Sequence, residues 1–234
     1  MPPGVDLPAD EKEAAATAMT VRLFACRERG RCASLSSVTG VPLPPEVIDA
    51  GPLVLQRIRE ADAEDLAAAV RRSLDHLRPW MQWATADAGD VQAQRQRIAA
   101  SQEQWGAGDH RYLMRADGDV LVGGCGLHRR VGPGGIEIGY WVHVDHTGRG
   151  YATAAARALT EAAFDLPDID KAEIHCDLAN VRSQAVPLRL RYRLDRIDAC
   201  ETVAPAEVGK RMIWIMNRSG AEEDGSGPRS QSSR

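Results

Sequence analysis

Residues 136–164 constrain the fold more strongly than any other stretch of the chain. Residues 136–144 are rich in β-branched and aromatic side chains and contain no proline, which predicts a strand. Residues 152–164 are dense in alanine, which predicts a helix. Between them, Gly148 and Gly150 permit backbone dihedrals that other residues avoid and let a ligand approach the main chain closely. The unpaired N–H groups and the dipole at the start of such a helix attract an anion, so this connection is a candidate phosphate site.

The same pattern also fits an ordinary strand–turn–helix connection whose glycines only make the turn tight. No Gly-Lys-Ser/Thr sequence follows the glycines, as a Walker A loop requires. The spacing also differs from the dinucleotide fingerprint G-x-G-x-x-G. Spacing alone therefore leaves both the phosphate site and the plain turn open.

The turn resembles the acyl-CoA pyrophosphate loop of the GNAT superfamily of N-acetyltransferases, usually Arg/Gln-Gly-x-Gly-x-Gly/Ala. Thr147 stands where arginine or glutamine is usual, which removes one side-chain contact but leaves the backbone cradle in place. The resemblance implies that acetyl-CoA is the cosubstrate and that its pyrophosphate is bound by Thr147, Gly148, Arg149, Gly150, Tyr151, Ala152 and Thr153.

The 234-residue chain is 44% hydrophobic, which is enough to bury one substantial core, and its length favours a single domain. Its formal net charge of -4 argues against a dedicated nucleic-acid-binding protein, which normally carries a basic domain. No apolar run approaches the roughly 18 residues that a membrane-spanning helix needs, and the N-terminus lacks a secretory signal pattern. We therefore expect no nucleic-acid or membrane partner and a cytoplasmic location.

The cysteines and histidines do not suggest a metal site. The five cysteines form an odd set at unrelated spacings, which suits reduced thiols in a cytoplasm. His143 and His146 stand three apart, but at a strand end and turn rather than on one helix face. We expect no bound metal.

Both ends differ in composition from the middle of the chain. Residues 1–45 mix prolines, an acidic stretch and an arginine-rich stretch with little periodicity, which predicts a poorly ordered extension in which Met19 is an alternative start. Residues 219–234 are rich in Gly, Ser, Asp, Glu and Arg and are predicted to be a disordered tail. The folded domain is then residues 46–218.

Hydrophobic periodicity and turn signals give the element order βααβββαβαββ. This order predicts a mixed α/β domain, with helices on both faces of a mostly antiparallel sheet. It is also the order of the GNAT fold, and the resemblance implies six to seven strands with the fourth and fifth splayed apart. The predicted strands are 52–58, 110–115, 120–128, 136–144, 171–177, 192–199 and 210–216. The first predicted helix is capped by Asp62, and the others span 90–105, 152–164 and 180–190.

Residues 180–192 resemble the GNAT element after the fifth strand, normally Asn-x-x-Ser/Ala-x-x-(Leu/Val)-x-x-Lys-Leu-Gly-Phe. The resemblance implies that Asn180 bonds the pantetheine arm and that Ser183 faces the thioester sulfur as a catalytic residue. Asparagine is also an ordinary helix N-cap, so a purely structural role for Asn180 stays open. Pro187 occupies the place of a tyrosine that serves as general acid in many relatives. Arg191 occupies the place of a glycine in a left-handed turn, at a cost on the order of 1 kcal/mol.

Residues 136–141 and 77–83 resemble the branch that acetylates the N-terminal alanine or serine of ribosomal proteins. The resemblance implies that Trp80, Trp83 and Tyr140 lie near the acceptor. Glu137 alternates with two isoleucines, so its carboxylate points away from the face that they bury. We interpret Glu137 as the catalytic base, acting through water, with a pKa raised by burial near the cosubstrate. A solvated glutamate paired with an arginine is the alternative.

The resemblance also implies the reaction. Acetyl-CoA lies between the splayed strands, and the backbone N–H of Trp141 or Val142 polarises the acetyl carbonyl, a contact typically worth about 3 kcal/mol. A neutral primary amine, either a protein N-terminus or a small molecule, attacks the thioester directly. The alternative function is a catalytically weak acyl-CoA-binding or sensor protein of the same fold. The oligomeric state is open, with a homodimer as one alternative.

Overall fold

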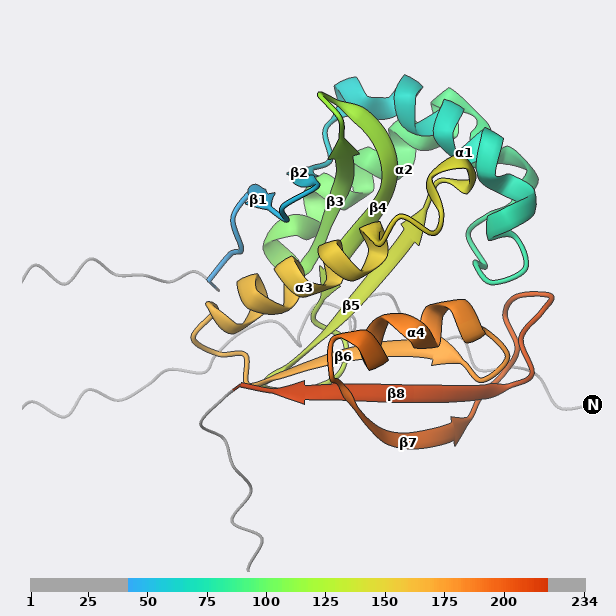
Figure 1. Cartoon of the computed structure of the whole chain (residues 1–234). Coiled ribbons are helices and arrows are strands. Elements are labelled where there is room, and N and C mark those ends of the chain that lie inside the picture. The colour runs from blue at the N-terminus through green and yellow to red at the C-terminus, as the bar shows by residue number, and fades with distance from the viewer. Residues whose placement is uncertain (1–41, 219–234) are drawn as a thin grey trace, which may run out of the picture. The chain divides into compact units, whose positions relative to one another are not determined.

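The computed structural model describes residues 42–218 (Figure 1). Residues 1–41 and 219–234 lie outside this range, so the N-terminal extension and the C-terminal tail stay predictions. Residues 42–45 form a loop that leads into the first strand. The carbonyl of Pro45 accepts a hydrogen bond from Tyr112 Oη at 2.8 Å, which fixes this loop to the sheet.

A single mixed sheet forms the centre of the described chain. Its strands are β1 (Val47–Asp49), β2 (Val54–Arg57), β3 (Asp109–Ala116), β4 (Val120–His128), β5 (Gly135–Val142), β6 (Lys171–Asp177), β7 (Arg193–Ala199) and β8 (Lys210–Asn217). The eight strands lie in the order β1-β2-β3-β4-β5-β6-β8-β7. All neighbouring pairs are antiparallel except β5 and β6, which are parallel.

The sheet has more strands than the six to seven that the sequence predicts. The additional strand is β1, which is only three residues long and pairs antiparallel with β2. Three residues are too few to show the alternation of period two by which a strand is recognised in a sequence. The other predicted strands are present, so the predicted mixed α/β architecture is confirmed.

Helices cover both faces of the sheet. The α-helices are α1 (Ala63–Leu77), α2 (Val91–Gln104), α3 (Tyr151–Phe164) and α4 (Val181–Arg189), and short 3-10 helices are η2 (Glu60–Asp62), η3 (Ala86–Gly89), η4 (Trp105–Ala107) and η5 (Val144–His146). In Figure 1, α3 and α4 cross the near side of the sheet and α2 lies behind β3 and β4. None of the helices within residues 42–218 is long and apolar enough to cross a membrane.

Alternation along the strands assigns each side chain to one of two apolar layers. Ile136 and Ile138 of β5 join the cluster that contains Ala155 and Leu159 of α3. Leu113 of β3 joins the cluster that is formed by α1 and α2 on the opposite face. We call the first face the α3 face and the second the α1/α2 face.

Two local predictions had different outcomes. Asp62 precedes α1, but its side chain makes no capping bond to that helix. Its carboxylate instead accepts the backbone N–H of Arg59 and pairs with Arg115, so the predicted cap is wrong. Arg191 adopts a positive φ of 63°, so the left-handed turn after α4 is kept without a glycine.

The glycines of β4 mark close approaches between neighbouring strands. The pairing of β3 with β4 shifts register between Met114 and Arg115. Gly123 lies opposite this shift with φ 157°, and a Cβ there would lie 2.3 Å from the carbonyl oxygen of Trp141. No side chain fits in that space, so the bulge requires glycine.

His110 is a fully buried titratable group in this fold. Its ring packs against Trp105 with the ring centroids 4.9 Å apart. Neither ring nitrogen has a hydrogen-bond partner among residues 42–218. Burial lowers the pKa of His110 from 6.5 to about 4, because a charged imidazole loses its hydration there.

We expect His110 to make stability depend on pH. Between about 4 and 6.5 the unfolded chain binds a proton at His110 that the folded chain does not bind. The free energy of unfolding therefore falls as the pH is lowered through this window, by at most about 1.4 kcal/mol per pH unit for one group. His110→Phe should flatten this dependence, as measured by urea unfolding at several pH values.

Ile98→Val is the matched control, because it perturbs the buried core without removing a titratable group. It should lower stability by a similar amount at every pH. An unchanged slope in His110→Phe would contradict the assignment.

Candidate active site

The parallel pairing of β5 with β6 ends after a few residues. Register partners are Gly135 with Lys171, Ile136 with Ala172 and Glu137 with Glu173. Beyond Glu137 the two strands continue without pairing to each other, while each stays paired to its outer neighbour. The predicted splay is confirmed, and it leaves the inner edges of both strands open.

Backbone direction decides which amide of β5 faces this opening. The N–H of His143 donates to the carbonyl of Val122 beyond β4, and the N–H of Lys171 donates to the carbonyl of Gly134. Because residues two apart in a strand direct their backbone groups to the same side, odd-numbered residues of β5 face β4 and even-numbered residues face β6. Of the two predicted donors, the N–H of Val142 faces the opening and the N–H of Trp141 faces β4.

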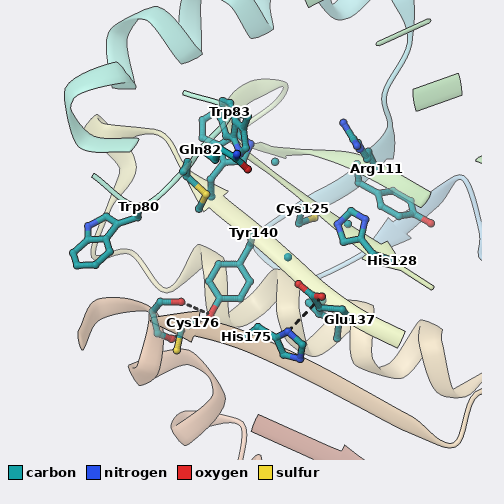
Figure 2. A pocket seen from close by; sticks show the side chains of 18 of the residues that line it. Trp80, Gln82, Trp83, Arg111, Cys125, His128, Glu137, Tyr140, His175 and Cys176 are labelled. Atoms are coloured by element: carbon teal, nitrogen blue, oxygen red, sulfur yellow. Dashed lines mark hydrogen bonds and ion pairs between the residues drawn. The ribbon is translucent and has the colours of Figure 1, made fainter. Parts of the chain in front are cut away.

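On the α3 face, two hydroxyl groups meet beside the opening. Tyr140 Oη lies 3.2 Å from Ser183 Oγ and donates to the backbone carbonyl of Ser183 at 3.2 Å. Burial raises the pKa of the Tyr140 phenol. Figure 2 shows this contact beside Cys176, whose thiol pKa burial raises to about 11. Sequence analysis assigned Tyr140 and Ser183 to different roles, and the structure brings them together.

Asn180 lies at the start of α4. Its Oδ1 accepts the backbone N–H of Ser183 at 3.1 Å, so Asn180 acts as the N-cap of this helix. The helix-capping role that the sequence left open for Asn180 is therefore present. A bond from its amide to the pantetheine arm stays a prediction.

A cavity of roughly 690 Å³ opens on the α1/α2 face and continues between β5 and β6 to Tyr140 and Ser183 on the α3 face. Its lining includes Trp80, Trp83 and Tyr140, which are the residues that sequence analysis placed near the acceptor. Trp83 packs edge-on against Trp141 with ring centroids 5.9 Å apart. Figure 2 shows Trp83 over the strands and Trp80 apart from it at the edge of the cavity.

Glu137 lines this cavity but is tightly paired. Arg130 Nε and an Arg130 terminal nitrogen donate to the two carboxylate oxygens of Glu137 at 2.8 and 2.6 Å. Burial alone would raise the pKa of Glu137, yet Arg130 and the nearby His175 hold it below its ordinary value. The predicted raised pKa is wrong, and the arginine partner of the alternative interpretation is present as Arg130.

Two histidines in the cavity were missed by sequence analysis. His175 Nε2 lies 2.6 Å from Glu173 Oε2, and its Nδ1 lies 3.5 Å from Glu137 Oε2. His128 Nδ1 lies 2.5 Å from Asp109 Oδ1. The alternation of residues 171–177 and 120–128 was the available signal, since it places both histidines on the face of Glu137 once the register is known.

The glycine turn before α3 has the features of an anion site. Gly148 and Gly150 adopt φ values of 77° and 81°, and no atom lies within 4 Å of a Cβ built on either. Gly150 is the N-cap of α3, so the N–H groups of residues 151–153 lie in the first turn and have no helical acceptor. Thr147 Oγ1 donates to the carbonyl of Val144 at 3.2 Å, so it stabilises the turn itself. These residues fit a phosphate group.

The turn is also attached to α1. The backbone N–H of Val144 donates to Ser73 Oγ at 3.1 Å. The guanidinium of Arg72 binds the carboxylate of Asp145 at 3.0 and 3.1 Å. The turn before α3 and the helix that covers the cavity are therefore in direct contact.

Comparison with known proteins identifies relatives of this chain. A family model described as "Acetyltransferase (GNAT) domain" matches residues 52–193. A protein of Bacillus subtilis (strain 168), YdaF, which is provisionally named a ribosomal N-acetyltransferase, is 38% identical over 56 residues. That match covers 24% of this chain and 31% of YdaF, so the chain matches less than a third of this relative's length.

Solved structures share the fold at low sequence identity. The ribosomal L7/L12 alpha-N-protein acetyltransferase RimL in complex with coenzyme A is 18% identical, with a TM-score of 0.67, and the match covers 74% of this chain and 98% of RimL. The microcin C7 self-immunity acetyltransferase MccE in complex with acetyl-CoA and AMP is 18% identical, with a TM-score of 0.68, covering 75% and 98% of the two chains.

We expect Arg130→Gln to raise the pKa of Glu137, because burial would then act without the guanidinium. The measurement is the pH titration of the Glu137 side-chain carboxyl carbon by ¹³C NMR. Arg129→Gln is the matched control, since Arg129 pairs with Asp168 instead. Equal titrations of Glu137 in both variants would show that Arg130 does not set its pKa.

Proposed function

The chain belongs to the GNAT acetyltransferase family, and we propose that it transfers the acetyl group of acetyl-CoA to a primary amine while both substrates are bound. The observation that carries this proposal is the opening between β5 and β6 beside the glycine turn of α3. The opening accommodates an extended chain between the two strands, and the glycine turn binds an anionic group at one end of that chain.

Binding of acetyl-CoA is assigned to residues 147–153 and to the opening. When bound, acetyl-CoA supplies an activated thioester whose carbonyl carbon an amine can attack. The first-turn N–H groups of α3 hold the pyrophosphate, and the N–H of Val142 polarises the acetyl carbonyl. Neither role needs a side chain at Thr147, whose hydroxyl bonds within the turn.

The two faces of the sheet carry groups with different proposed roles. Ser183 and Tyr140 lie on the α3 face, where their hydroxyl groups stabilise the departing thiolate. We assign this role to the pair because Pro187 stands where, in many relatives, a tyrosine serves as the general acid. Glu137 lies on the α1/α2 face, where its carboxylate attracts the ammonium form of the acceptor into the cavity.

The acceptor is proposed to be the α-amine of a protein or peptide. One support is RimL, whose name describes an acetyltransferase for the ribosomal protein L7/L12. The other is the open cavity of roughly 690 Å³ beside Trp83. A cavity of this size admits one or two residues of an extended chain rather than a folded surface.

The direct test is transfer to defined amines. The full chain is incubated with acetyl-CoA and peptides that begin with alanine or serine, and with small primary amines. Free thiol release and acetylated product are then measured. We expect product on at least one peptide. Binding of acetyl-CoA without thiol release would instead make the protein an acyl-CoA-binding protein.

Gly150→Asp should weaken acetyl-CoA binding by at least tenfold in calorimetry. It places a carboxylate against the pyrophosphate and a side chain at a φ of 81°. Gly118→Asp is the matched control, because Gly118 also has a left-handed φ, of 80°, and open space around it, but lies in the turn between β3 and β4. It should keep the acetyl-CoA affinity. Unchanged affinity in Gly150→Asp would remove the assignment of this loop.

A further inference from the structure

We propose that His128, oriented by Asp109, accepts the proton that the attacking amine loses. This inference rests on the proposed function and names a catalytic residue and a positioning residue for it. The two side chains extend from neighbouring strands, since Asp109 of β3 and His128 of β4 are register partners.

The contact with Asp109 fixes the tautomer of His128. Asp109 Oδ1 lies 2.5 Å from Nδ1. Burial acts against ionisation of Asp109, but the bonds from His128 and Arg111 lower the pKa of this carboxyl well below its ordinary value. An ionised carboxylate only accepts hydrogen bonds, so Nδ1 of His128 must donate. In the neutral ring Nε2 then carries the lone pair that can take a proton.

Two glycines place Nε2 against the open floor of the cavity. Gly126 of β4 and Gly139 of β5 are register partners. A Cβ at Gly126 would lie 3.0 Å from His128 Nε2, and one at Gly139 would lie 3.3 Å from it. The ring therefore lies directly over the backbone of β5, next to the stretch that separates from β6. Nε2 has no hydrogen-bond partner within the described range 42–218.

The other acid–base groups beside His128 are already engaged. Glu137 is the register partner of His128, and Figure 2 shows the two side chains close together in the cavity. Both oxygens of Glu137 accept bonds from Arg130. His175 lies between two carboxylates, those of Glu173 and Glu137. Glu137 and His175 are each held by a charged partner, whereas Nε2 of His128 bonds to no other residue within 42–218.

The charged groups that face His128 are paired with partners of their own. Asp109 faces His128 from β3. Its carboxylate also pairs with Arg111, whose terminal nitrogen lies 2.7 Å from Asp109 Oδ2. Glu137 faces His128 from β5 and is balanced by Arg130. Asp109 therefore stays next to the ring as the acceptor of the Nδ1–H bond when Nε2 takes the proton.

The step balances without any further reactant. A neutral amine attacks the acetyl carbon, an N–C bond forms and the C–S bond breaks. The proton of the amine moves to His128 Nε2 and then to solvent. The thiolate of coenzyme A takes a proton from solvent as it leaves, next to Ser183 and Tyr140 on the other face. The products are the amide and free coenzyme A.

The test compares variants of the full chain in acetyl transfer to alanine- and serine-initiated peptides. His128→Gln should lower kcat by roughly 10²- to 10⁴-fold, the usual contribution of general base catalysis, with unchanged acetyl-CoA affinity in calorimetry. The loss should shrink as pH rises, because hydroxide from the solvent can then take the proton that the amine loses. His128→Ala should regain part of its rate when imidazole is added, since the ring space over Gly126 is then empty.

Asp109→Asn should lower kcat by roughly tenfold with little change in KM for the peptide, because the amide can hold the wrong tautomer. Asp109→Glu should restore part of kcat. His76→Gln is the matched control, since His76 lies in the last turn of α1 and should leave kcat unchanged. Glu137→Gln should cost less in kcat than His128→Gln and more in KM.

Two results would overturn the inference and one would remove its basis. His128→Gln with an unchanged kcat, or His128→Ala that binds acetyl-CoA normally but gains nothing from imidazole, shows that His128 does not take the proton. A wild-type chain that transfers acetyl to no amine overturns the proposed function, and this inference with it.

Discussion

The early end of the parallel ladder between β5 and β6 is the constraint on which the rest of the structure depends. Backbone N–H and C=O groups that leave a ladder cost free energy unless the strand is held elsewhere. Here β4 pairs with β5 from Gly123↔Val142 to His128↔Glu137, and β8 pairs with the whole of β6. Each strand is fixed on its outer side, so its inner edge can stay open for a ligand.

A strand directs successive side chains to opposite faces, and this alternation separates the parts of the site. Tyr140 lies on the α3 face with Ser183, whereas Glu137 and His128 lie on the α1/α2 face. Glycines at 124, 126 and 139 leave room on the latter face for the rings of Trp141 and His128. The row of glycines that weakens β4 as a strand therefore shapes the cavity floor.

Sequence patterns predicted the parts of the fold that depend on local chemistry. The turn before α3 and the N-cap at Asn180 follow from a few adjacent residues. The pKa of Glu137 and the contact of His128 with Asp109 depend on partners that are 7 and 19 residues away in the chain. These pairs meet only through strand register, which single-sequence periodicity does not determine.

The attachment of the glycine turn to α1 has a thermodynamic consequence. Val144 bonds to the buried Ser73 of α1, and the same helix lines the cavity with Leu66 and Val70. A ligand on the turn and a ligand in the cavity thus act on one shared helix. By thermodynamic linkage, if the first ligand changes the affinity for the second by some factor, the second changes the affinity for the first by the same factor. Helix α1 therefore connects the two parts of the site, although none of its side chains takes part in the proposed transfer.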